Sequence, residues 1–223
     1  MPRFALSLGA ALGLIASGCG GAPALPLAIV AARNAADLVH RLLLERHDPN
    51  ERDANGLTPL MWAARSGAVE AMAALLDGGA DLEARDDQNG WTALFHAVHV
   101  RQSAAVRLLL DRGADPNAFA HWATPLMMAA ADRDPVFVEL LLQHGADAHL
   151  RGIGGSTALS EAVSGGALAD IDRPLLGGCR PATVRALLAH DPTLTLPNTI
   201  ASREAIFWAR LHGCADVLRL VRR

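Results

Sequence analysis

The chain has 223 residues, of which 51% are hydrophobic, and this length is sufficient to bury a sizeable core. Its formal net charge of −3 excludes a strongly basic protein, so bulk electrostatics gives no reason to expect a nucleic-acid partner.

The first residues have the features of a leader. Arg3 precedes an apolar stretch from Phe4 to Ile15, which is too short to cross a bilayer as a stable helix. Small residues at 16–18 then lead to Cys19. A positive start, a short apolar core and small residues are typical of a secretory signal peptide, so we expect the protein to be exported.

Two cleavage sites are open for this leader. The residues before Cys19 resemble a bacterial lipobox, which implies a signal peptide at 1–18 and a lipid on Cys19, although Ala16 stands where that pattern prefers Leu. Ala22-Pro23-Ala24 offers an ordinary small-x-small site instead, with cleavage near residue 24. If the lipid is present, Gly20 lacks the Asp of an inner-membrane retention signal, which favours the outer membrane, facing the periplasm.

A short block recurs three times after the leader. Its members are Thr58-Pro59-Leu60, Thr92-Ala93-Leu94 and Thr124-Pro125-Leu126, and each is followed at the same distance by Gly-Ala-Asp. Thr is a good helix N-cap, Pro fits the first helical position, and Gly ends a helix, so each block predicts a helical hairpin. Equal internal spacing at a period of about 33 residues predicts a helical solenoid.

These motifs closely resemble ankyrin repeats, and the resemblance covers roughly residues 24–223. It implies an all-α solenoid of about five to six helix-turn-helix units, with degenerate units at both ends that meet solvent. The fifth unit begins at Gly155 and resumes at Leu187, so we expect an insertion at about 166–180.

The resemblance also implies a non-catalytic protein-binding module whose turn tips and first helices form a concave face. Trp91 stands between Gly90 and Thr92, where a solvated residue would suffice, so we expect it to anchor a partner. Position by position, the ankyrin pattern assigns the partner-binding role to Arg52, Asn55, Leu57, Arg65, Gln88, Trp91, His99, His121 and Asp132.

Catalytic motifs are missing from the sequence. We find no nucleophile elbow, phosphate-binding glycine loop or zinc-protease motif, and we predict neither enzymatic activity nor a cofactor. His96 and His99 are spaced to share a metal on one helix face, although no further ligand stands at suitable spacing. A His-based metal- or ligand-binding protein is therefore an alternative.

Cys179 and Cys214 remain once Cys19 is set aside, and an exported protein permits disulfides. Both align near the start of the second helix in adjacent units, about 10 Å apart, which is beyond direct bridging reach. The insertion before Cys179 could close this gap. We predict a disulfide between them, with two buried thiols as the alternative.

Taken together, the sequence predicts an exported binding protein held to the outer membrane by lipid on Cys19, with no other membrane contact. Exported bacterial ankyrin proteins resemble one another as accessory or inhibitory partners of envelope enzymes and toxins. By this fold-level analogy we expect an envelope or secreted enzyme or toxin as the partner, and a chaperone-like or immunity role. A secreted effector that binds a host protein is the alternative.

Overall fold

The computed structural model describes residues 26–121, 123–132, 134–164 and 181–221. Within these ranges the chain forms six consecutive helix pairs and no strand beyond one isolated bridge between Ala120 and Ala123. The predicted all-α solenoid is therefore confirmed. No helix in these ranges is long and apolar enough to cross a membrane. The predicted leader, both cleavage sites and the insertion lie outside the described residues.

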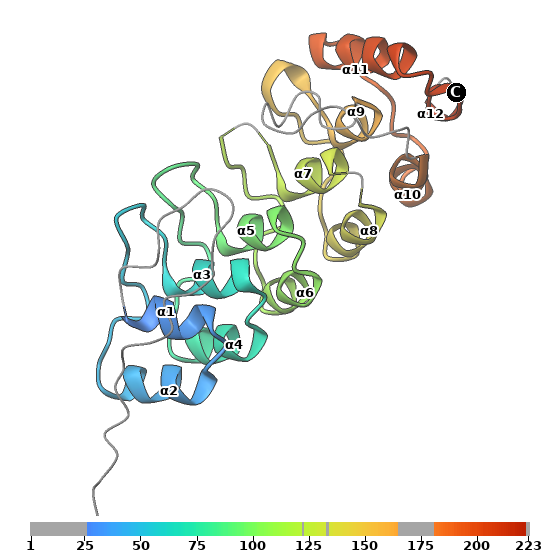
Figure 1. The fold of residues 1–223 in the computed structure, drawn as a ribbon. Helices are drawn as coiled ribbons and strands as arrows, with labels where there is room; N and C mark the ends of the chain where they lie inside the picture. Colours follow the sequence, from blue (N-terminus) through green and yellow to red (C-terminus); the bar gives the residue numbers. More distant parts are fainter. Residues whose placement is uncertain (1–25, 122, 133, 165–180, 222–223) are drawn as a thin grey trace, which may run out of the picture.

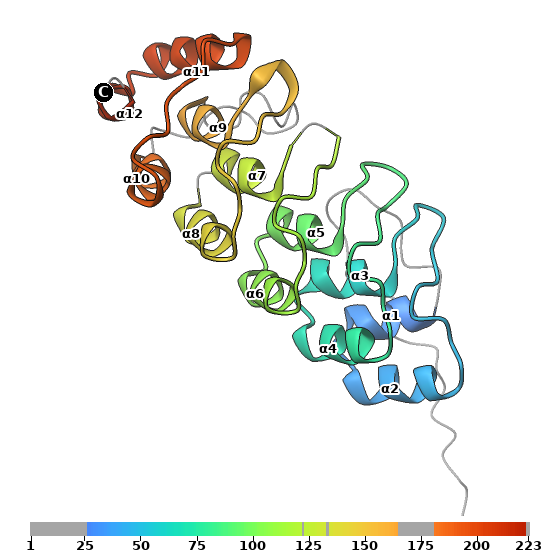
Figure 2. The same ribbon diagram turned by 180° about the vertical axis from the view of Figure 1, so that it is seen from behind.

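The helices stack in two layers (Figure 1). The first layer holds the first helix of each pair: α1 (Pro26–Ala32), α3 (Pro59–Ser66), α5 (Ala93–His99), α7 (Pro125–Ala131), α9 (Ala158–Ser164) and α11 (Ile200–Leu211). The second layer holds α2 (Ala36–Leu44), α4 (Val69–Asp77), α6 (Ser103–Asp111), α8 (Pro135–Gln143), α10 (Pro181–His190) and α12 (Ala215–Leu220). A short 3₁₀ helix, Ile153–Gly155, precedes α9. The turns between pairs project beyond the first layer, away from the second (Figure 2).

Local sequence explains where α3, the first helix of the second pair, begins and ends. Thr58 caps α3 by accepting a hydrogen bond from the backbone N–H of Met61 at 3.4 Å, and Pro59 occupies the first helical position. Gly67 ends α3 with a φ of 68°, in the left-handed region that glycine adopts without steric cost. The same N-cap recurs at Thr124, which accepts from Met127 at 3.3 Å.

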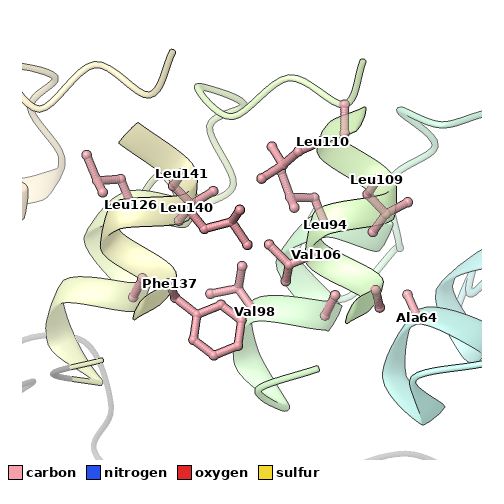
Figure 3. Packing of buried hydrophobic residues seen from close by; sticks show 14 of the residues in the cluster. Ala64, Leu94, Val98, Val106, Leu109, Leu110, Leu126, Phe137, Leu140 and Leu141 are labelled. Atoms are coloured by element: carbon pink, nitrogen blue, oxygen red, sulfur yellow. The ribbon is translucent and has the colours of Figure 1, made fainter. Parts of the chain in front are cut away.

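The core is one continuous apolar strip between the two layers, as Figure 3 shows for its central part. Leu94 of α5 and Leu109 of α6 are 1% and 0% exposed, and Leu126 and Leu141 repeat this pairing one unit further on. Small residues such as Ala64 allow neighbouring helices to approach closely. Because each unit buries its apolar face only against its neighbours, the stack is stable as a whole rather than unit by unit.

Side chains at the start of each turn bind one unit to the next. Asn50 donates from Nδ2 to the carbonyl of Gly79 and accepts from the backbone N–H of Asp81. Asn117 makes the same two bonds two periods later, to Gly145 and Asp147. These repeated bonds hold successive turns at a fixed spacing, so the surface that the turns form is ordered before anything binds to it.

Candidate protein-binding surface

Each turn of the second and third repeats is tied to the helix that follows it by a buried or half-buried aspartate. Asp53 accepts hydrogen bonds from the backbone N–H groups of Asn55 and Leu57, and from Nε1 of Trp62 at 3.0 Å. The carboxylate therefore satisfies the tight turn and fixes the indole of α3 at the same time. This bond explains why Trp62, with 4% exposure, can be buried without leaving its N–H unpaired.

Asp86 plays the same part in the third repeat. Its Oδ1 accepts from the backbone N–H groups of Gln88 and Asn89, and its Oδ2 lies 2.9 Å from Nε2 of His96. Both side chains are buried, with 2% and 4% exposure. This pair was not predicted, because the two residues are ten positions apart in different elements. The turn aspartate that recurs at Asp53 was the signal in the sequence that pointed to it.

The pair consists of a carboxylate and a neutral imidazole. Burial raises the pKa of Asp86, but the hydrogen bond from His96 and those from the backbone outweigh it, so that the pKa lies below its ordinary value. Burial lowers the pKa of His96 in spite of the neighbouring carboxylate. His96 therefore donates its Nε2–H to Asp86 near neutral pH, and the bond fixes the turn against α5.

This bond also bears on the metal-binding alternative. Nε2 of His96 is committed to Asp86, so that nitrogen is not available to a metal shared with His99. Among the described residues, no group of three or more His, Cys, Asp or Glu side chains is placed to hold a metal ion.

Trp91 is a half-exposed ring in the turn that leads into α5. Its centroid is 4.9 Å from that of His99, 5.4 Å from that of His96 and 6.1 Å from that of Phe95, with which it is stacked. The indole thus packs against its own repeat and still presents surface to solvent. This packing is compatible with the expected partner contact, because packing on one side holds the ring rigid.

The second repeat has a comparable pair of groups. The guanidinium of Arg65 lies over the Trp62 ring at 5.2 Å from its centroid, within the range of a cation–π contact. Both Arg65 and His99 are half-exposed and occupy the same position in their helices, seven residues after the N-cap Thr. In two successive units a basic side chain therefore lies against an aromatic ring, which is buried at Trp62 and half-exposed at Trp91.

Hydrogen bonds join the polar residues of neighbouring turns. Arg52 contacts Asp87 at 2.7 Å and the carbonyl of Arg85 at 2.6 Å. Gln88 donates from Nε2 to Asn55 Oδ1 at 2.8 Å, and Nδ1 of His121 lies 2.8 Å from the carbonyl of Asn89. The structure therefore brings four of the predicted residues together along one edge: Arg52, Asn55, Gln88 and His121.

Leu57 is a correction to the predicted surface. Its side chain is 3% exposed and belongs to the apolar core, because it is the residue at which the chain turns inward to begin α3. Asp132 is half-buried at the C-cap of α7. Phe119, 39% exposed in the next turn, is an apolar surface residue that the sequence analysis did not select.

Cys214 is buried, with 7% exposure, at the N-cap of α12. It is disulfide-bonded, and its partner lies outside the described residues, as do Cys179 and Cys19. The predicted pairing of Cys179 with Cys214 stays a prediction.

Comparison with known proteins now identifies the family. Two family models of ankyrin repeats match the chain, one over residues 27–120 and the other over residues 109–162. The fold is similar to the crystal structure of the ankyrin repeat domain of Bcl-3, described as a unique member of the IkappaB protein family. The two share 30% sequence identity over 87% of this chain and 81% of that chain, with a TM-score of 0.71. No curated protein matches the sequence significantly.

The chain therefore belongs to the ankyrin-repeat family, as its sequence predicts. Ankyrin repeats are protein–protein interaction modules, and the fold is typically a non-catalytic scaffold.

Proposed function

We propose that this protein holds a partner protein against the surface formed by the turns and first helices of its second to fourth repeats. We call this the binding surface and define it by Arg52, Arg65, Gln88, Trp91, His99 and His121. The observation that carries the proposal is the position of Trp91, a half-exposed indole packed on His99 in the middle of this surface. Tryptophan and arginine are the side chains most enriched where binding energy concentrates.

The rigidity of the binding surface supports the same proposal. Its turns are joined by Arg52 with Asp87 and by Gln88 with Asn55, and its floor is fixed by His96 with Asp86. Side chains that are already ordered lose little further freedom on binding, so more of the contact energy remains as affinity. Arg52 of this surface lies beside the exposed carboxylate of Asp87, which indicates a partner with a mixed rather than a uniformly charged face.

The place of action is also a proposal. Arg3, the apolar stretch from Phe4 to Ile15 and the small residues before Cys19 support export, with a lipid on Cys19 that holds the protein to the outer membrane. In that setting the partner is an envelope or secreted enzyme or toxin, which the protein assists or inhibits.

Fractionation tests this location. With a lipid on Cys19, the protein sediments with the outer membrane and incorporates labelled fatty acid, and Cys19→Ser abolishes both. Mature protein in the culture medium, without lipid, would instead favour the secreted effector that binds a host protein.

Site-specific photo-crosslinking in cells tests the binding surface itself. A photoreactive residue at Gln88, which is exposed on a turn, is expected to capture one partner. The matched control carries the same group at Arg107, which is exposed on α6 in the second layer. Capture from position 88 that is lost in Trp91→Ala supports the proposal, whereas equal capture from position 107 contradicts it.

A further inference from the structure

Two asparagines of this chain precede a glycine, and both lie in turns of the middle repeats. Asn55-Gly56 is in the turn of the second repeat, and Asn89-Gly90 is in the turn of the third. Asparagine is a chemically labile residue, and its side-chain amide is most open to attack where the next residue has no side chain to block the approach. The two pairs therefore place the same reactive sequence in two structural settings.

The Asn55-Gly56 pair is held by hydrogen bonds on both sides. The backbone N–H of Gly56 donates to the carbonyl of Asp53 at 2.9 Å. Oδ1 of Asn55 accepts from Nε2 of Gln88 at 2.8 Å, and the Asn55 carbonyl accepts from the backbone N–H of Asp87 at 3.2 Å. Gly56 is buried, and a methyl group added there would collide with Asp87. The groups that would have to react are thus already engaged.

The Asn89-Gly90 pair is much less constrained. Within the part of the chain that the structure describes, neither the side chain of Asn89 nor the backbone N–H of Gly90 makes a hydrogen bond. Both residues are only half-buried, and a methyl group added at Gly90 would meet no described atom within 4 Å. The turn is anchored through other atoms of Asn89: its backbone N–H donates to Asp86 at 2.6 Å, and its carbonyl lies 2.8 Å from Nδ1 of His121.

We propose that Asn89 is a modification site at which the side-chain amide is lost without an enzyme. The backbone nitrogen of Gly90 attacks Cγ of Asn89 and forms a bond with it. The bond between Cγ and Nδ2 breaks, and Nδ2 leaves as ammonia with the proton that the Gly90 nitrogen gives up. Solvent water then opens the cyclic imide at one or the other of its two carbonyl carbons, so that position 89 becomes aspartate or isoaspartate.

Either product changes the binding surface, because position 89 lies between Gln88 and Trp91. Aspartate adds a negative charge to a turn that already carries Asp86 and Asp87. In isoaspartate the main chain runs through the former side chain, so the carbonyl that lies 2.8 Å from His121 becomes a carboxylate. The effect on a partner rests on the proposed function, whereas the modification itself needs no partner and is tested without one.

Peptide mapping of the purified full chain by mass spectrometry, sampled over time at pH 8, tests the proposal. Cleavage after arginine places Asn55 in residues 53–65 and Asn89 in residues 86–101, so the two sites are followed separately. The peptide with Asn89 is expected to gain the mass difference between an amide and an acid, as two products that chromatography separates. Asn55 is expected to react about tenfold more slowly, or slower still, since the hydrogen bonds that hold its pair must break first.

Unfolding provides the matched control. In urea the hydrogen bonds of both turns are lost, and the two sites are expected to react at similar rates. In the folded protein, Asn89→Gln is expected to abolish the mass change in residues 86–101, with the helix content unchanged by circular dichroism. Equal rates at the two sites of the folded protein would overturn the proposal, as would an Asn89 that reacts only in urea. A difference that persists in urea would also overturn it, because it would come from neighbouring residues in the sequence rather than from the fold.

Discussion

Repeats two to four and the C-terminal part of the stack are built from similar helix pairs but distribute their polar and apolar side chains differently. In the middle repeats, apolar side chains fill the core and polar ones line the turns. In α9 all seven residues are buried, and three of them are polar: Ser160, Glu161 and Ser164. In α11 the large apolar residues lie outside. The middle repeats therefore hold a rigid surface on an apolar core, whereas the C-terminal part buries polar groups in α9 and exposes apolar ones on α11.

One helical position makes this contrast plain. The fourth residue after the N-cap Thr is Trp62 in α3 and His96 in α5, and both reach the aspartate of their own turn. The same position in α9 is Glu161, which hydrogen-bonds Ser156 and leaves Oε2 buried without a hydrogen-bond partner among the described residues. An acid in this place cannot donate to a turn unless it is protonated.

The largest expected effect comes from exchanging a leucine in each region for alanine. Leu109 is fully buried between α6 and its neighbours, so Leu109→Ala should lower the free energy of unfolding by about 2–5 kcal/mol. Leu211→Ala, at a residue 62% exposed, should change it by less than about 0.5 kcal/mol. Urea denaturation of both variants measures the difference, and equal losses would refute the assignment of an outward face on α11.

Glu161 should make the fifth repeat less stable as the pH rises. Burial raises the pKa of Glu161 from 4.5 to about 7, and the hydrogen bond with Ser156 offsets this only in part. The folded state therefore keeps a proton that the unfolded chain releases, so stability is fully present below pH 4.5 and is lost as the pH rises through about 7.

Replacing the acid by its amide removes this loss. At pH 8, Glu161→Gln should be more stable than the wild type by up to roughly 3 kcal/mol, whereas at pH 4.5 the two should be nearly equal. Denaturation at both pH values tests this expectation. A wild type with the same pH dependence as the variant would contradict the buried position of the acid.

The third repeat should respond to pH in the opposite direction. The pKa of His96 is lowered from 6.5 by burial, so the unfolded chain takes up a proton that the folded imidazole does not, and stability falls as the pH drops below 6.5. His96→Phe removes this dependence but leaves Asp86 Oδ2 without its donor, which should cost about 1–3 kcal/mol at pH 7. Thermal melts between pH 5 and 8 compare the wild type with the variant. If the variant loses as much stability below pH 6.5 as the wild type does, the neutral imidazole is contradicted.

The smallest expected effect distinguishes two N-cap threonines. Thr58 caps α3, so Thr58→Ala should cost about 1 kcal/mol. Thr92 occupies the same position before α5, but its side chain makes no cap hydrogen bond and its buried Oγ1 has no partner among the described residues. Thr92→Ala should therefore cost clearly less, which urea denaturation resolves; a loss equal to that of Thr58→Ala would show that the hydroxyl is capped after all.

The fold could be predicted well from the sequence because the signals that start and end each helix are local. Thr58, Pro59 and Gly67 determine where a helix begins and ends through bonds to residues within the same turn, and such signals can be read without coordinates. The repeat alignment also placed Arg52, Gln88 and Trp91 on adjacent turns. Leu57 was assigned wrongly because the alignment identifies a position in the turn, but the direction of its side chain depends on where the chain bends inward.

The remaining features depend on contacts between elements. The bond between His96 and Asp86 joins a turn to a helix, and the recurring turn aspartate alone does not show which helix residue it reaches. On α11, the alanines at 205 and 209 fit the ankyrin pattern and gave no sign that Phe207 would face solvent. The exposure of Phe207 depends on whether another first-layer helix packs against α11, and the pattern does not show this.

The binding constant of the captured partner tests the central claim most directly. It would be measured by titration calorimetry for wild type, Trp91→Ala and Phe207→Ala, after denaturation has shown that each variant is folded. We predict that Trp91→Ala weakens binding tenfold or more, as expected for an interface anchor, and that Phe207→Ala leaves it unchanged. Full affinity in Trp91→Ala together with a loss in Phe207→Ala would contradict the account and move the partner to the C-terminal face.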